Sequence, residues 1–109
     1  MGKSGGMGDL MKMQQKLAEV QEGLRAKTVE GAAGGGMVKA TLNGHHEVIA
    51  VQIDPVSVDP DDLELLEDLI VAAIADGRSK AEEMAAEEMR NAVSEMGLPP
   101  MLANQLLGQ

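Results

Sequence analysis

The fold is decided by residues 59–96, which read DPDDLELLEDLIVAAIADGRSKAEEMAAEEMRNAVSEM. The opening Asp-Pro-Asp-Asp predicts a helix start, with Asp59 as the N-cap and Pro60 at the first helical position. Gly97, with prolines close behind it, predicts the end of the same helix. Between them one stripe recurs at intervals of three and four residues, which keeps it in line along a nearly straight helix. The stripe consists of Leu63, Leu66, Ile70, Ile74, Gly77, Ala81, Ala85, Glu88, Ala92 and Met96.

This helix is too long to be buried by its own chain. Residues 59–96 would span roughly 50–55 Å at about 1.5 Å per residue. A domain of 109 residues, by comparison, has a radius of gyration of about 13 Å. The first half of the helix is rich in Leu and Ile, and the second half offers mostly Ala and Met. We therefore expect the first half to be core and the second half to be an arm that projects or leans on a partner.

The composition limits how the core can be built. The chain has no aromatic residue and no cysteine, so its core must consist of Leu, Ile, Val, Ala and the nine Met. A small aliphatic core combined with an over-long helix predicts an obligate homodimer. The absence of cysteine excludes disulfides and thiolate metal sites and suits a reducing, cytoplasmic location. No apolar run reaches the about 18 residues of a membrane span, so we expect no membrane partner.

The net charge of −9 comes from the C-terminal half of the chain. Residues 1–58 contain six basic and six acidic residues, whereas residues 59–109 contain three basic and twelve acidic residues. A bulk negative charge disfavours nucleic acid as a partner. Any nucleic-acid binding must therefore use the N-terminal half.

The N-terminal part is expected to be a flexible segment followed by a helix. Residues 1–8 are glycine-rich, and Asp9 is a candidate N-cap. The apolar residues that follow form a narrow stripe with three- and four-residue spacing. Such a helix either lies on its own domain or forms a coiled-coil seam with the long helix of this chain or of a partner, and the narrow stripe favours the seam. The stripe consists of Leu10, Met13, Leu17, Val20 and Leu24.

Three short strands are expected between the two helices. Their alternating apolar residues define one face, which includes Val38, Ala40 and Leu42. The glycine-rich residues 31–36 are expected to form a flexible hairpin loop, and Asn43-Gly44 is a strong hairpin signal. The strand candidates are residues 27–30, 37–42 and 47–53.

The order of these elements predicts the fold class. A helix, a three-stranded antiparallel meander and a long helix together make an α+β fold. We assign residues 1–8 to a flexible N-terminus and residues 9–97 to a single dimerising domain. Residues 98–109 are a C-terminal tail, in which residues 101–107 can form a short helix.

No set of residues predicts catalysis or metal binding. Gly2-Lys3-Ser4 lacks the strand and the glycines that precede it in a phosphate-binding loop. His45 and His46 are adjacent, so on a strand they would point to opposite faces, and we interpret them as turn residues. Without a nucleophile–base–orienter set, we predict no enzyme, no cofactor and no small-molecule substrate. The acids of the long helix are expected to pair with nearby bases, as Arg78 with Glu82, Lys80 with Glu83 and Arg90 with Glu87.

A series of short segments follows the glycine-rich start in a fixed order. They are LMK at 10–12, GGGMVK at 34–39, LNG at 42–44, VQIDP at 51–55, LEDLIVAA at 66–73, KAEE at 80–83 and GLP at 97–99. In this order and spacing the chain, from residue 1 to about residue 100, resembles the YbaB/EbfC family of bacterial nucleoid-associated proteins. The resemblance implies a homodimer whose two meanders form a shared body with projecting helical arms. It also implies that the dimer binds DNA in the bacterial cytoplasm, compacting it or influencing expression.

The resemblance places the candidate DNA contacts on the first helix. The family's DNA contacts are associated with the helical arms, which correspond here to Lys12, Lys16 and Arg25. Lys3 and Lys27 extend the same stretch, the only one with surplus bases. The bases of the long helix are weaker candidates because of their acidic neighbours. No aromatic residue can stack on a base, and no Arg/Asn cluster is placed to read base edges, so we expect little sequence preference.

The predicted dimer interface is apolar. It combines the narrow stripe of the first helix, the last strand and the first half of the long helix. The residues are Leu10, Leu17, Ile49, Val51, Leu66, Ile70 and Ile74.

The sequence is also compatible with a function of another class. The chain would then be an acidic dimeric scaffold or chaperone-like adaptor that grips a protein partner with Met-rich helical arms, because Met suits adaptable binding surfaces. We favour the interpretation that these methionines pack at the dimer seam. They are Met11, Met84, Met89 and Met96.

Overall fold

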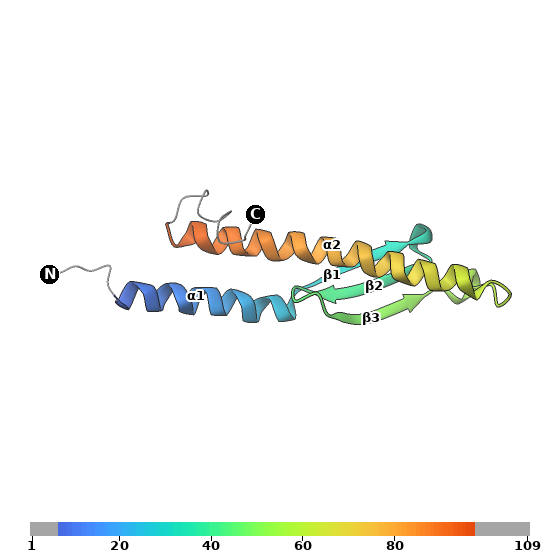
Figure 1. The fold of residues 1–109 in the computed structure, drawn as a ribbon, viewed down its shortest axis with the longest axis horizontal. Coiled ribbons are helices and arrows are strands. Elements are labelled where there is room, and N and C mark those ends of the chain that lie inside the picture. The colour runs from blue at the N-terminus through green and yellow to red at the C-terminus, as the bar shows by residue number, and fades with distance from the viewer. Residues whose placement is uncertain (1–6, 98–109) are drawn as a thin grey trace. The chain divides into compact units, whose positions relative to one another are not determined.

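The computed structural model describes residues 7–97 and confirms the predicted α+β class (Figure 1). A helix is followed by three antiparallel strands and one long helix. Lys3 and the predicted helix at residues 101–107 lie outside the described residues. The elements are α1 (Met7–Ala26), β1 (Thr28–Ala33), the 3-10 turn η1 (Gly34–Gly36), β2 (Val38–Asn43), β3 (Val48–Ile53), the 3-10 turn η2 (Pro55–Ser57) and α2 (Leu63–Glu95).

The chain divides into two compact units. The first, Leu24–Ala85, contains the three strands and the first part of α2. The second consists of Met1–Gly23 and Ala86–Gln109, of which residues 7–23 and 86–97 are described.

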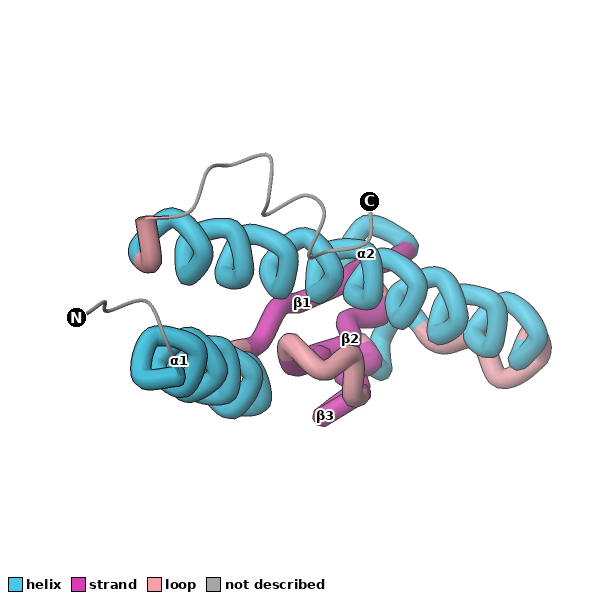
Figure 2. The backbone as a smooth tube through the Cα atoms, turned by 60° about the vertical axis from the view of Figure 1, so that its left-hand side comes forward, coloured by secondary structure: helices cyan, strands magenta, loops and turns pink. Residues whose placement is uncertain are grey.

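In the first unit, α2 lies along one face of a sheet with strand order β1-β2-β3 (Figures 1 and 2). The predicted inward face of β2 is confirmed, because Val38, Ala40 and Leu42 are buried and form a core with Ala73 of α2. Antiparallel pairing sets Ala40 between Gly31 of β1 and Val51 of β3. The core is supplied by β1, β2 and α2, since no residue of β3 belongs to it among those described. Partly buried residues that pack against it are Val29, Ala33, Leu66, Leu69, Ile70 and Ile74.

The expectation of a flexible loop over residues 31–36 was wrong in its first half. Strand β1 continues through Gly31 to Ala33, and only the glycines of η1 form the turn. Gly31 is buried in the strand because α2 passes directly over it. The three glycines of η1 have φ values of 64°, 67° and 96°, which residues with side chains rarely adopt.

The hairpin predicted at Asn43-Gly44 is confirmed, although its turn is built differently. Residue 46, a histidine with φ of 67°, takes the left-handed conformation. Asn43 is buried and organises the turn, because its Oδ1 accepts the N–H groups of His45 (2.9 Å) and Glu47 (3.1 Å). Gly44 is required for space, since a Cβ there would lie 2.7 Å from the Leu24 Cβ.

The start of α2 differs from the prediction. The helix begins at Leu63, and the carboxylate of Asp62 accepts the Leu65 N–H at 3.2 Å, so Asp62 is the N-cap. Asp59 organises the preceding turn instead, where its Oδ1 accepts the Asp61 N–H at 2.9 Å. The predicted end is confirmed, because Gly97 follows the last turn with φ of 80°.

In the second unit, α1 and the end of α2 lie side by side (Figures 1 and 2). Helix α1 begins at Met7, so Asp9 belongs to its first turn and is not its N-cap. The stripe residues Met13, Leu17 and Val20 of α1 are half-buried. The end of α2 is not fully exposed to solvent, since Ala92 and Val93 are buried.

Candidate functional surfaces

The basic side chains of α1 in the second unit are not equally available. Lys12 is exposed, whereas the Lys16 Nζ lies 2.7 Å from the Glu95 Oε1 at the end of α2. The hydrogen bond to Glu95 and the charge of that carboxylate raise the pKa of Lys16. Lys16 keeps 37% of its side chain exposed, so it remains reachable by an anion that competes with Glu95. The sequence gives no sign of this partner, which lies near the other end of the chain.

Arg25 and Lys27 lie in the first unit, around the junction between α1 and β1. Both are exposed, and the backbone that carries them is fixed by the hairpin turn. The Gly44 N–H donates to the carbonyl oxygens of Leu24 (2.8 Å) and Lys27 (3.1 Å). The two cations are therefore presented from a fixed backbone next to the turn. The predicted DNA contacts are divided between the two units, with Lys12 and Lys16 in the second and Arg25 and Lys27 in the first.

Two of the three bases of α2 pair with acids of the same helix. The predicted pair of Arg90 and Glu87 is confirmed at 3.2 Å. The predicted pair of Lys80 and Glu83 was wrong, because the Lys80 Nζ lies 3.1 Å from the Asp76 Oδ2, one turn earlier. In this pairing both side chains lie at the outer edge of β1.

At that edge Asp76 and Lys80 bond directly to the strand backbone. The Asp76 Oδ2 accepts the Ala32 N–H at 2.9 Å, and the Lys80 Nζ donates to the Glu30 carbonyl oxygen at 3.1 Å. The Ala32 N–H, followed by the hydrogen bond from Lys80, lowers the pKa of Asp76. We call these two side chains and their two backbone partners the β1 edge clasp. Sequence reasoning missed it, since an Asp and a Lys four residues apart indicate a helical pair and say nothing about a strand.

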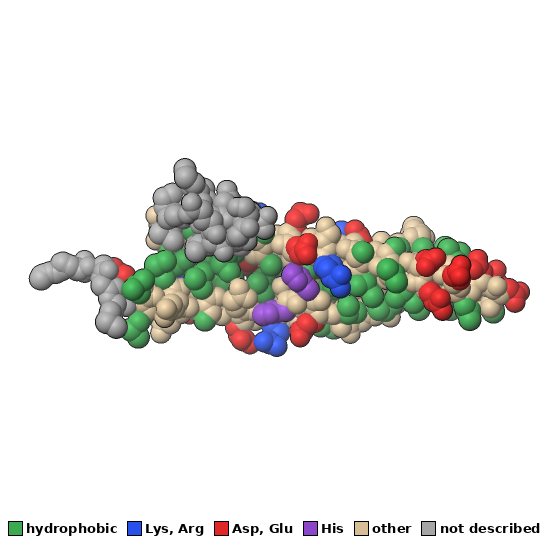
Figure 3. Space-filling model, viewed as in Figure 1, with side chains coloured by type: hydrophobic (Ala, Val, Ile, Leu, Met, Phe, Trp, Pro, Cys, Tyr) green, Lys and Arg blue, Asp and Glu red, His purple; other side chains and the backbone are tan. Residues whose placement is uncertain are grey.

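Strand β3 is exposed along its whole length. Val51 and Ile53 pair with the buried Ala40 and Val38 and so belong to the core face, yet they remain 39% and 38% exposed. The predicted interface residue Ile49 is 56% exposed, at an irregularity where the pairing passes from Ala50 directly to Val48. Figure 3 shows hydrophobic side chains gathered over this part of the molecule, with acidic side chains gathered beyond them at the start of α2. We call the exposed apolar residues Val48, Ile49, Val51, Ile53 and Leu65 the β3 apolar surface.

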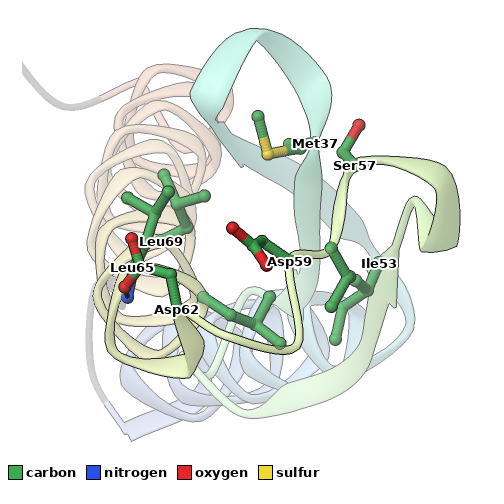
Figure 4. A pocket seen from close by; sticks show the side chains of 9 residues that line it. Met37, Ile53, Ser57, Asp59, Asp62, Leu65 and Leu69 are labelled. Carbon is green, nitrogen blue, oxygen red and sulfur yellow. Dashed lines mark hydrogen bonds between the residues drawn. The ribbon is translucent and has the colours of Figure 1, made fainter.

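A cleft between η2, the preceding strand and the start of α2 continues this surface (Figure 4). Leu65 and Leu69 lie on its α2 side and Ile53 on its strand side. Its two carboxylates, Asp59 and Asp62, already accept backbone N–H groups. The cleft thus offers apolar contact rather than a polar binding site. Within residues 7–97 no three or more His, Cys, Asp or Glu side chains are grouped so as to hold a metal ion.

The remaining predicted interface residues are distributed over both units. Leu66, Ile70 and Ile74 are half-buried against the core of their own chain, and each keeps part of its surface open. Leu17 is half-buried in the second unit, and Leu10 is 59% exposed near the start of α1. These residues do not form one continuous surface within the first unit, because Leu10 and Leu17 belong to the other unit.

Comparisons with known proteins show which family the chain is similar to. The family model described as the YbaB/EbfC DNA-binding family matches residues 1–96. A nucleoid-associated protein of Syntrophobacter fumaroxidans is 51% identical over 87 residues, which cover 80% of this chain and 79% of that protein. A nucleoid-associated protein of Gluconacetobacter diazotrophicus is 47% identical over 96 residues, covering 88% of this chain and 90% of that protein.

A solved structure supports the fold. The crystal structure of an uncharacterized protein from Helicobacter pylori is similar to this chain with a TM-score of 0.68. The match covers 85% of this chain and 99% of that one at 24% identity, and it shows the fold alone. None of the helices within the described range has a stretch that is long and apolar enough to span a bilayer.

Proposed function

The chain belongs to the YbaB/EbfC DNA-binding family, and from this premise we propose that it binds duplex DNA as a homodimer in the bacterial cytoplasm. The match of the family model to residues 1–96 carries the proposal, because it includes both helices and the whole sheet. The family is a DNA-binding family and not an enzyme family. We accordingly propose an architectural role in the nucleoid, with no reaction and no cofactor.

The DNA contacts are proposed to come from the bases of the N-terminal half. Lys12, Lys16, Arg25 and Lys27 are at least partly exposed, and Lys3 extends the same stretch. Lys and Arg side chains on a helix surface neutralise phosphates and release counterions, which makes affinity depend steeply on salt. A dimer doubles the number of such contacts. Since the chain has no aromatic residue to stack on a base, binding is expected to show little sequence preference.

The homodimer is proposed to form through the β3 apolar surface. Monomeric proteins rarely leave a contiguous apolar patch of several side chains exposed next to an open strand edge. Here the open strand is the one whose core-face residues Val51 and Ile53 stay 39% and 38% exposed. Packing this surface against a second copy would complete a core that a single chain leaves unfinished.

The test is a titration of the purified protein with duplex DNAs of unrelated sequence at several salt concentrations. We expect binding that weakens steeply as salt rises and differs little between sequences. Absence of binding even at low salt would contradict the proposal. That result would favour the acidic adaptor, although Met84, Met89 and Met96 are half-buried and only Met11 of the four methionines is exposed.

A further inference from the structure

The two edges of the sheet differ in whether side chains of the chain bond to their outward backbone groups. In an antiparallel ladder alternate residues of an edge strand point their N–H and C=O groups away from the neighbouring strand. In β1 these residues include Glu30 and Ala32, and in β3 they include Val51 and Ile53, as the registers with β2 require. Such outward groups are the template on which a further strand pairs.

At β1 the template is occupied. The β1 edge clasp places the Asp76 carboxylate on the Ala32 N–H and the Lys80 ammonium on the Glu30 carbonyl. The contact of Gly31 with the backbone of α2 lies between these two bonds and holds the helix against the strand. A further strand could pair here only after both side chains had left.

At β3 the template is open. No side chain of the described residues bonds the outward groups of Val51 or Ile53. The strand reads VIAVQI and carries no charge, so two copies can meet along it without like-charge repulsion. Natural edge strands are commonly protected by charges, prolines or covering elements, and β3 itself has none of these.

We propose that the β1 edge clasp closes this edge against a second copy, so that copies of the chain associate through β3 alone and stop at two. The inference rests on the proposed homodimer and adds what limits the assembly to two copies. A sheet with two open edges can add copies at both ends without closing, whereas a sheet with one open edge forms a closed twofold pair. The partner is a second copy of this chain, and the residues that exclude a third are Asp76 and Lys80.

The main experiment compares the assembly of three proteins. They are the wild type, the clasp variant Asp76→Ala/Lys80→Ala and the control Glu87→Ala/Arg90→Ala. The control removes an exposed ion pair of the same helix and leaves the net charge equally unchanged. The Asp76 and Lys80 side chains are 42% and 50% exposed, so their truncation leaves no buried cavity. Circular dichroism establishes that each variant is folded, and sedimentation equilibrium over a hundredfold range of concentration gives the mass.

We expect the wild type and the control to stay at twice the chain mass, and the mass of the clasp variant to rise beyond it with concentration. A folded clasp variant that keeps the wild-type mass at every concentration would overturn the inference. A wild type that sediments as a single chain would instead refute the homodimer. In that case the proposed role of the clasp is supported if the clasp variant has a larger mass than the wild type, and it is refuted if the two masses are equal.

Hydrogen exchange of the wild-type protein gives a test that needs no variant. The Ala32 N–H should be protected by the Asp76 carboxylate, whereas the Glu30 N–H, which also points outward from β1, should exchange rapidly. Equal and rapid exchange at both positions would show that the clasp does not hold in solution. Equal protection would show that a strand is paired along β1. Either result would overturn the inference.

Discussion

Gly31 of β1 and Gly77 of α2 lie in backbone contact, and neither has room for a side chain. A Cβ on Gly31 would collide with the Gly77 backbone and the Ala73 carbonyl oxygen, and a Cβ on Gly77 would collide with the Leu42 side chain. The contact sets how closely α2 approaches the sheet. It therefore fixes the position from which Asp76 reaches Ala32.

Replacing Gly31 with Ala should destabilise the protein by about 3 kcal/mol, near the upper end of the usual cost of overpacking, because the obstacles are backbone atoms that cannot rotate away. Chemical denaturation followed by circular dichroism measures this. Gly23→Ala is the matched control, since Gly23 lies within α1 and a Cβ there meets nothing within 4 Å. The control should gain about 0.5–1 kcal/mol from helix propensity. Similar losses in both variants would mean that the contact is looser than the structure shows.

The N-cap of α2 gives a second prediction. Asp62→Ala should lower the free energy of unfolding by about 0.5–2 kcal/mol, because the Leu65 N–H loses its acceptor. Asp59→Ala should cost less, since it disturbs only the turn before the helix. Thermal unfolding of the two variants at equal protein concentration compares them. A larger loss of stability in Asp59→Ala would show that Asp59 is the N-cap, as predicted from the sequence.

The β1 edge clasp predicts a pH dependence. The Ala32 N–H and Lys80 lower the pKa of Asp76 from its ordinary 3.8, so the folded state favours the carboxylate. Its stabilisation is fully present above pH 3.8 and is lost as the pH falls through the lower folded-state value. Asp76→Asn should therefore flatten the decline of the unfolding free energy as the pH falls below about 4. Lys80→Met should give an intermediate slope, and identical slopes in all three proteins would contradict the assignment.

The sequence was sufficient where local rules decide the structure. The periodicity of α2 predicted its buried side, and the alternation of β2 predicted that Val38, Ala40 and Leu42 face the core. The prediction of a loop at Gly31 was wrong because the local preference of glycine for a turn is overridden by a contact with a helix far along the chain. Asp59 misled because two acids three residues apart are equally suited to cap a helix, and only the backbone geometry selects Asp62.

The candidate surfaces were predictable only in part. Exposed Ile49 and Val51 follow from an apolar strand in a small chain that a single helix cannot cover. The bonds of Asp76 to Ala32 and of Lys16 to Glu95 join positions distant in sequence, and no spacing rule indicates them. The assignment of DNA contacts to Lys12, Lys16, Arg25 and Lys27 stays a prediction that binding experiments must decide.

Neutralising the two lysines of α1 is the first test of that assignment. Lys12 and Lys16 lie one helical turn apart, so both can follow the same phosphate track. Lys12→Gln/Lys16→Gln removes up to about four phosphate contacts per dimer and should reduce the slope of log affinity against log salt by about 3–4. Binding is measured by fluorescence anisotropy of labelled duplex DNA. An unchanged slope would exclude Lys12 and Lys16 as phosphate contacts.

The ion pair of Lys16 with Glu95 makes a sharper prediction, because here a mutation should strengthen binding. The 2.7 Å contact must be shared or broken when Lys16 meets a phosphate, so Glu95 competes with DNA for the ammonium group. Glu95→Gln should raise the affinity for DNA at low salt, because Lys16 no longer has to break an ion pair when it meets a phosphate. Glu82→Gln is the matched control, since it removes the same charge from an exposed position of the same helix. If both variants gain equally, the effect is one of net charge alone, and Lys16 is not a phosphate contact.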